Sequence, residues 1–321
     1  MQKKLNQVAN ICIKCRQSLP IDAKFCMNCG TPVIKEVIDC PSCRLPNPPG
    51  TKSCYHCGTL LVRPDTISLD YTREYDLTGD TDIINSGLKG LFFKSLRTFI
   101  DTVFGNDRYS DYVELFYATD MQKKFDTKAR VVTESILKTN TINTKEAYMR
   151  SDQLVSHLIR NMVMYHVIVH GKEINPCLLP ESILWYQQST KKNLPLKDMI
   201  SDFLDLDREN LKIYTDFLTM PAEKLKNAAQ SFLFAEKQEL IFFICDQSLF
   251  GNAKDGFAMT NFGLYWKAEL LKAQKIMYHD LKYIKKGNGH LLINGLFFNV
   301  NPSVNIKMHL LLQQLQDIFS K

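Results

Sequence analysis

Hydrophobic residues are spaced in two ways along this chain, at helical intervals in the middle and in short runs near the C-terminus. From residue 83 to about residue 218, apolar positions recur three and four residues apart. One such stripe consists of Leu88, Leu91, Phe92, Leu96, Phe99 and Val103. Residues at this spacing share one face of an α-helix, so the stripe predicts a core-facing helix that ends near Gly105.

The same spacing predicts two more helices in the middle region. Asp107 is in position to cap a helix that runs through Tyr112 and Phe116. A third helix is expected near residues 145–170, where the apolar positions are Leu154, Leu158, Met162, Tyr165 and Val169. The apolar runs fall well short of the ~20 residues that a helix needs to cross a bilayer, so no transmembrane segment is predicted.

The last third of the chain has a different pattern. A helix is expected after Pro221, because proline suits the first turn of a helix, where no N–H donor is needed. Runs rich in β-type residues follow at 240–245, 257–260, 264–267, 275–278, 281–284, 291–293 and 297–300. Asn and Gly residues separate several of these runs, as is typical of antiparallel hairpins. Residues 304–319 then carry the apolar spacing of a closing amphipathic helix.

About seven short strands followed by one helix is the outline of a pleckstrin-homology-like (PH-like) barrel. Residues 243–266 and 276–281 resemble a PH-like domain found at the end of many bacterial multi-domain proteins of unknown role. The resemblance implies a small β-barrel with a closing C-terminal helix over residues 206–321.

The strongest chemical pattern lies in the first 57 residues, where eight of the ten cysteines form Cys-x-x-Cys pairs. The pairs are Cys12/Cys15, Cys26/Cys29, Cys40/Cys43 and Cys54/Cys57. One such turn directs two thiolates at a metal ion, and two turns complete a tetrahedral zinc site with no open position. The pattern therefore predicts structural zinc.

A repeat of 28 residues indicates which cysteine pairs share a metal. Ten residues separate successive pairs, so spacing alone leaves the assignment open. The repeat matches Cys12 with Cys40, Pro20 with Pro48, and residues 29–31 with residues 57–59. It gives two four-cysteine modules, 12–29 and 40–57, each too small to fold on a hydrophobic core alone. Two structural zinc ions are expected.

Other uses of paired cysteines fit this segment less well. A thioredoxin-like redox motif needs a single Cys-x-x-Cys beside a βαβ pattern, which the segment lacks. A disulfide framework needs an oxidising compartment, but the first ten residues contain no apolar signal-peptide core, so a cytoplasmic protein is expected. The cysteine segments resemble the bacterial double zinc ribbon (DZANK-type) domain. That resemblance implies zinc binding and a role as an adaptor module.

Charge is unevenly distributed along the chain. Residues 1–63 contain nine Lys and Arg against three Asp and Glu, which accounts for the whole net charge of +6. Residues 64–82 are acidic with few large apolar side chains, so a flexible linker is expected there. The predicted fold is multi-domain α+β. Its parts are tandem zinc ribbons at 1–63, the acidic linker at 64–82, an α-helical domain at 83–205 and a PH-like domain at 206–321.

Outside the cysteine pairs the sequence contains no recognisable catalytic constellation, and the protein is predicted not to be an enzyme. His166 and His170 are four residues apart on one predicted helix face, but two ligands cannot complete a zinc site. The two unpaired cysteines are interpreted as packed core thiols. Asp246 and Asp255 are interpreted as turn residues, because no histidine or nucleophile is in register with them.

These features favour a non-enzymatic adaptor or regulatory protein that docks macromolecular partners, chiefly proteins, through its zinc ribbons and PH-like domain. The alternative is a nucleic-acid-binding regulator that uses the basic ribbons. Phe25 and Tyr55 are the only aromatic residues that the ribbons offer for base stacking. Peripheral membrane contact is a third class, through the stripe at 88–103 or the lysines at 282, 285 and 286, but it rests on few charges.

Overall fold

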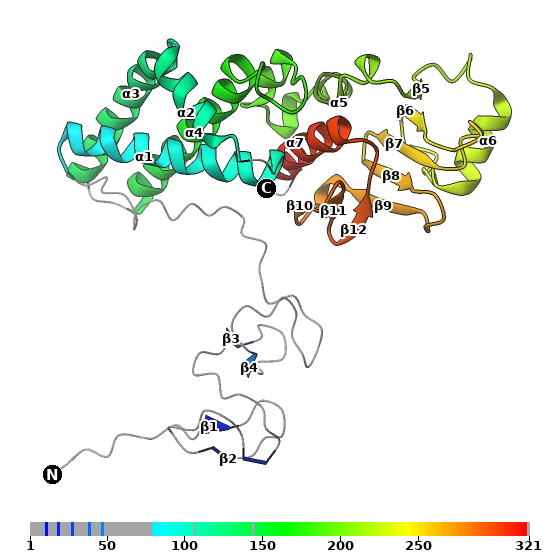
Figure 1. Cartoon of the computed structure of the whole chain (residues 1–321), viewed down its shortest axis with the longest axis horizontal. Helices are drawn as coiled ribbons and strands as arrows, with labels where there is room; N and C mark the ends of the chain where they lie inside the picture. The colour runs from blue at the N-terminus through cyan, green and yellow to red at the C-terminus, as the bar shows by residue number, and fades with distance from the viewer. Residues whose placement is uncertain are drawn as a thin grey trace. The chain divides into compact units, whose positions relative to one another are not determined.

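The computed structural model describes residues 10–11, 18–19, 27–28, 38–39, 46–47, 79–105, 107–142 and 145–319. The chain divides into two compact units, Met1–Ser68 and Leu69–Lys321, whose helices and strands are labelled in Figure 1. The domain boundary expected between residues 205 and 206 lies inside the second unit. The predicted domain limits stay predictions.

The described part of the first unit contains two short antiparallel strand pairs. β1 (Asn10–Ile11) pairs with β2 (Ser18–Leu19), and β3 (Ile38–Asp39) pairs with β4 (Pro46–Asn47). Two-residue strands are too short to be stable by themselves. These described strands therefore need a further source of folding energy, which the predicted zinc sites would supply.

The second unit begins with a helical region, whose elements appear on the left and in the centre of Figure 1. They are α1 (Thr81–Phe99), the π-helix η1 (Ile100–Phe104), α2 (Tyr109–Ala118), α3 (Met121–Ile142), α4 (Lys145–Tyr165), the π-helix η2 (His166–His170), the 3₁₀ helices η3 (Glu181–Tyr186) and η4 (Lys191–Asn193), α5 (Leu196–Leu204) and the 3₁₀ helix η5 (Leu206–Arg208). Helices α1, α3 and α4 pack against one another.

The first predicted helix is confirmed, and its apolar stripe faces the core. Leu88, Phe92 and Leu96 are fully buried. The carboxylate of Asp80 caps α1 by accepting hydrogen bonds from the backbone N–H groups of residues 82 and 83. The helical path ends at Gly105, whose φ of 61° lies in the left-handed region that favours glycine at a helix end.

Two details of the predicted helices are wrong. The N-cap of α2 is Arg108 rather than Asp107, and no side chain caps this helix. On α4, Leu154 is 42 % exposed, whereas Val155 and Ile159 are buried. Because α4 packs on both α1 and α3, its buried face is centred one position later than the predicted stripe.

The C-terminal part of the second unit contains two antiparallel sheets and two helices. The first sheet has the order β5 (Lys212–Tyr214), β6 (Ile241–Asp246), β7 (Gly256–Thr260), β8 (Gly263–Lys267) and β9 (Gln274–Met277). The second contains β10 (Ile284–Lys286), β11 (Leu291–Ile293) and β12 (Leu296–Phe298). α6 (Ala222–Ser231) connects β5 to β6, and α7 (Pro302–Phe319) ends the described chain. Each predicted β-type run overlaps a strand, whereas β5 was not predicted.

The closed barrel expected for residues 206–321 is wrong. Among the described residues, β9 and β10 do not pair, so the five-stranded and three-stranded sheets stay separate. The chain leaves β9 through the 3₁₀ helix η6 (Tyr278–Asp280), whose buried Tyr278 hydroxyl donates to the carbonyl oxygens of Thr260 and Gly263. The indole N–H of Trp266 donates to the Phe297 carbonyl oxygen at 2.7 Å and joins the sheets through a side chain.

Both faces of the five-stranded sheet are covered. Alternate residues such as Phe257 and Leu264 belong to the large core shared with α7. The strand residues that alternate with these, such as Ala258 and Tyr265, belong to a smaller core that includes Ala228 of α6. A strand alternates its side chains between faces, so two apolar neighbours explain why β6, β7 and β8 are apolar almost throughout.

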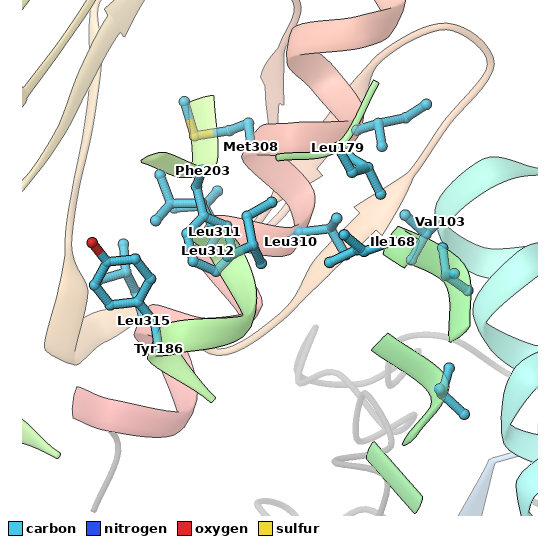
Figure 2. Close-up of a cluster of buried hydrophobic side chains, with 14 of the residues drawn as sticks. Val103, Ile168, Leu179, Tyr186, Phe203, Met308, Leu310, Leu311, Leu312 and Leu315 are labelled. Atoms are coloured by element: carbon cyan, nitrogen blue, oxygen red, sulfur yellow. The ribbon is translucent and has the colours of Figure 1, made fainter. Parts of the chain in front are cut away.

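The C-terminal helix α7 lies between the sheets and the helical region. Twelve of its 18 residues are buried. Figure 2 shows Met308, Leu310, Leu311, Leu312 and Leu315 of α7 clustered with Val103, Ile168, Leu179, Tyr186 and Phe203. The amphipathic helix predicted at 304–319 is therefore present, but residues 304–312 are covered on every side because the helical region packs on the face turned away from the sheets.

A buried ion pair fixes α7 to the end of the helical region. The ammonium of Lys307, only 2 % exposed, donates to the Glu209 carboxylate at 2.8 Å. Ser303 and Asn301 also donate hydrogen bonds to this carboxylate. Burial by itself would raise the pKa of Glu209, but these hydrogen bonds outweigh burial and hold that pKa below its ordinary value.

We expect Leu311→Ala to lower the free energy of unfolding by about 3 kcal/mol, because the cavity would form in a core shared by helices and sheet. Leu311 is fully buried, whereas Leu218 is 97 % exposed. Leu218→Ala is therefore the matched control and should change stability by less than about 0.5 kcal/mol. Urea unfolding checks both variants, and equal midpoints would contradict the shared core.

We expect Glu209→Gln to destabilise the protein by about 3 kcal/mol at neutral pH, since it leaves the Lys307 ammonium buried without a counter-charge. The pKa of Glu209 is lowered in the folded state, so the ion pair stabilises the fold above the ordinary carboxyl pKa of 4.5 and loses this effect as pH falls. The stability difference between the two proteins should thus shrink as the pH falls below 4.5. Urea unfolding over a pH series measures it. Asp207→Asn, at an exposed neighbouring carboxylate, should show no such convergence.

Candidate metal centres

The eight predicted zinc ligands lie outside the described residues, but the described strands flank them in the sequence. These ligands are Cys12, Cys15, Cys26, Cys29, Cys40, Cys43, Cys54 and Cys57. The first cysteine pair falls in the six residues between β1 and β2, and the third pair falls in the six residues between β3 and β4. In each module, the connection of a short antiparallel hairpin carries two of the four thiols.

The strand pairs repeat with the same 28-residue offset as the cysteines. Asn10 is opposite Leu19 in the first pair, and Ile38 is opposite Asn47 in the second. Adding 28 to the residue numbers of the first strand pair gives the second strand pair, with the same positions opposite each other. At the described strands, the sequence repeat is therefore also a structural repeat.

The second cysteine pair brackets a described turn. Met27 and Asn28 lie between Cys26 and Cys29, and Met27 is 94 % exposed. A methionine that faces solvent contributes nothing to an apolar core. The donor set of four thiolates per module fits a closed tetrahedral zinc site.

His166 and His170 belong to the helical core instead of a metal site. His166 is fully buried, with Nε2 2.8 Å from the Tyr112 carbonyl oxygen, and burial lowers its pKa to about 4. His170 Nε2 lies 3.4 Å from a carboxylate oxygen of Asp120. Within residues 79–105, 107–142 and 145–319, no three His, Cys, Asp or Glu side chains are grouped so as to hold a metal ion.

The two cysteines outside the pairs are free thiols. Cys245 is fully buried, and burial raises the pKa of its thiol to about 12. Cys177 is half-buried at the edge of the large core, and burial raises its pKa as well. Neither thiol is disposed to ionise as a nucleophile near neutral pH, which agrees with their interpretation as packed core residues.

Asp246 and Asp255 organise the connection between β6 and β7. The Asp246 carboxylate is buried and accepts hydrogen bonds from the N–H groups of Ser248 and Ala253. Asp255 pairs with Lys267 at 2.6 Å. Both carboxylates are committed to loop structure, as the interpretation of them as turn residues requires.

Two of the features considered for membrane contact, the α1 stripe and Lys286, make contacts within the protein. The apolar stripe of α1 is buried in the core. The ammonium of Lys286 donates to the carbonyl oxygen of Phe104, at the end of η1. Burial lowers the pKa of Lys286. The stripe and this lysine are therefore unavailable as a membrane-binding surface.

Sequence reasoning missed a group of exposed apolar residues at one end of the five-stranded sheet. Leu249, Phe250, Leu270 and Leu271 lie in the β6–β7 and β8–β9 connections and are all exposed. The available signal was two adjacent large apolar residues inside each turn segment, where polar residues are usual.

The comparisons bear on the N-terminal segment. Residues 12–58 match the family model described as double zinc ribbon, and the match includes all eight paired cysteines. No curated protein and no solved structure matches the chain. Among the residues that the structure describes, every helix is too short or too polar to pass through a bilayer. The family match indicates that the N-terminal segment resembles double zinc ribbons and binds zinc, with a structural role for the metal.

Proposed function

We propose that the protein is a non-enzymatic, zinc-dependent adaptor that docks protein partners in the cytoplasm. The observation that carries this proposal is the agreement between the cysteine repeat and the strand repeat in the first unit. Each module presents a small, metal-stiffened surface, and small rigid surfaces bind partners at low entropic cost. The second unit would then be the folded platform to which the ribbons are tethered.

Each ribbon holds one zinc ion in this proposal. Residues 12–29 supply four thiolates to the first site, and residues 40–57 supply four to the second. With every position of the tetrahedron taken by protein, neither ion has a place for substrate or water. The metal would stabilise the fold and leave recognition to the surrounding side chains.

The absence of catalysis is part of the same proposal. It is supported by His166 and His309, the two histidines with strongly lowered pKa values, because both lie in packed cores. Burial lowers the pKa of each to about 4. Neither residue lines the two surface hollows beside the five-stranded sheet. A general base needs access to its substrate, and burial is the main cause of both pKa shifts.

The resemblance of the C-terminal part to PH-like domains suggests a second docking module within the platform. The order of strands followed by a C-terminal helix supports it, although the sheets do not close into a barrel. In this proposal the second unit recognises its own partner, independently of the ribbons.

Nucleic acid is the alternative partner of the ribbons. It is favoured by the excess of nine basic over three acidic residues in residues 1–63. Electrostatic binding of this kind would be strongly weakened by salt. The shortage of aromatic residues for base stacking and the absence of an arginine cluster favour protein.

We expect two zinc ions per chain by elemental analysis of the reduced, purified protein. Cys29→Ser should remove one ion and unfold its own module while the other module keeps its metal, because the four thiolates supply most of each module's folding energy. Cys57→Ser is the matched variant of the second module. One ion or none in the unmodified chain would refute the repeat-based assignment.

We expect deletion of residues 1–63 to abolish capture of a specific protein partner from host lysate while the second unit stays folded by circular dichroism. Nuclease-treated and untreated lysates should give the same partner. Equal capture by the shortened chain would move the docking role to the second unit. Capture that is lost with nuclease and weakened by salt would instead support the nucleic-acid alternative.

A further inference from the structure

The exposed apolar residues of the β6–β7 and β8–β9 connections form a separate surface feature, here called the apolar tip. It consists of Leu249, Phe250, Leu270 and Leu271, which are 77 %, 86 %, 96 % and 47 % exposed. In an antiparallel sheet, alternate connections lie at the same end, so topology brings these two loops together. A hollow of about 280 Å³ separates them and is lined by Leu249, Phe250 and Leu270.

The β6–β7 loop holds its part of the apolar tip outward through a dense set of hydrogen bonds. The buried Asp246 carboxylate accepts from the N–H groups of Ser248 and Ala253, and the Ser248 hydroxyl oxygen accepts from the N–H groups of Asn252 and Ala253. α6 anchors the loop from outside, since the Asn227 side chain donates to the Asn252 carbonyl oxygen at 2.9 Å. Leu249 and Phe250 are thus presented on an ordered loop.

The β8–β9 loop places Leu270 outward at some conformational cost. Leu270 has a φ of 61°, in the left-handed region that leucine seldom adopts. The N–H of Leu271 closes this turn onto the Ala268 carbonyl oxygen at 3.0 Å. Asparagine or glycine would suit the turn better, so its backbone chemistry does not explain the nearly fully exposed leucine.

Lysines surround the apolar tip. Lys254 lines the hollow, and Lys272 follows Leu271 directly; both are exposed. Lys212 reaches the same loop, because a Cβ at Gly251 would lie 2.9 Å from its Nζ. Lys267 pairs with Asp255, and Glu269 is the further acidic side chain that lines the hollow. The rim is therefore net positive.

The composition of this surface distinguishes a lipid occupant from a protein one. Energetically dominant residues at protein interfaces are enriched in Trp, Tyr and Arg, while leucine is under-represented among them and lysine is depleted. Surfaces that lie in the membrane interface combine Leu and Phe with lysine. Projecting side chains also enter a bilayer without a matching pocket, and the lysines complement an anionic leaflet.

We propose that the apolar tip inserts into the surface of an anionic lipid bilayer, with Leu249, Phe250 and Leu270 in the headgroup–acyl boundary and Lys254, Lys272 and Lys212 against lipid phosphates. This attachment is independent of the zinc ribbons. It gives the second unit a membrane-facing end at the connections β6–β7 and β8–β9, opposite in the sheet to the β7–β8 turn.

The test uses the full chain and sedimentation with vesicles of phosphatidylcholine containing about 30 % phosphatidylserine. We expect binding to these vesicles and much weaker binding to pure phosphatidylcholine. The double variant Leu249→Ser/Phe250→Ser should bind at least about tenfold more weakly, because two buried apolar side chains are lost from the lipid contact. Lys254→Glu/Lys272→Glu should remove the preference for anionic vesicles.

Leu218→Ser is the matched control, since Leu218 is a 97 % exposed leucine outside the apolar tip, and it should bind as the unmodified chain does. Zinc chelation should also leave binding unchanged, which separates this proposal from the function assigned to the ribbons. In a Phe250→Trp variant, the added indole should show a blue-shifted emission when vesicles are present.

Three results would overturn the proposal. They are no binding to anionic vesicles, equal binding by the Leu249→Ser/Phe250→Ser and Leu218→Ser variants, and binding by the Phe250→Trp variant without an emission shift. Self-association in the absence of lipid that only the Leu249→Ser/Phe250→Ser variant loses would assign the apolar tip to a second copy of the chain.

Discussion

Burial of α7 on every side is the constraint on which the second unit depends. An ordinary surface helix covers one core with one stripe, but α7 must satisfy the five-stranded sheet, the three-stranded sheet and the helical region together. Its polar residues then need partners inside the protein. Lys307 bonds to Glu209, Asn305 to the Gly289 carbonyl oxygen, and Gln314 to the Tyr186 carbonyl oxygen. These directional contacts fix the rotation of α7 about its axis and its position along that axis. Apolar packing alone would allow several such positions.

The two units differ in the stabilising interactions that the structure and the family match indicate. The second unit buries one large apolar core and a smaller one beneath α6. The described strands of the first unit are two residues long, and the double zinc ribbon match indicates that zinc contributes to the stability of this unit. Removing metal should affect the first unit and leave the second as it is, because no core residue of the second unit is a metal ligand.

The buried titratable and charged groups of the second unit mostly have structural roles. His166, Cys245 and the Glu209–Lys307 pair are sealed within packed elements. At its surface, the second unit presents the apolar tip on two ordered loops, with lysines beside it. Recognition uses exposed side chains and catalysis needs accessible titratable groups, so this distribution is consistent with the proposed binding role.

The sequence by itself determined the local structure and the metal chemistry. Helical spacing located α1 and α4, short β-type runs located β6 to β12, and the 28-residue cysteine repeat anticipated the repeated strand pairs and the double zinc ribbon match. Such features depend on neighbours within a few residues, or on a fixed ligand spacing. Other features depend on the tertiary structure. The two sheets stay separate, and Leu154 is exposed although it lies on an apolar stripe. Both faces of α7 are buried, and four apolar loop residues lie at one end of a sheet. Each of these outcomes depends on which distant segment covers a given face, and periodicity records only that a face is apolar.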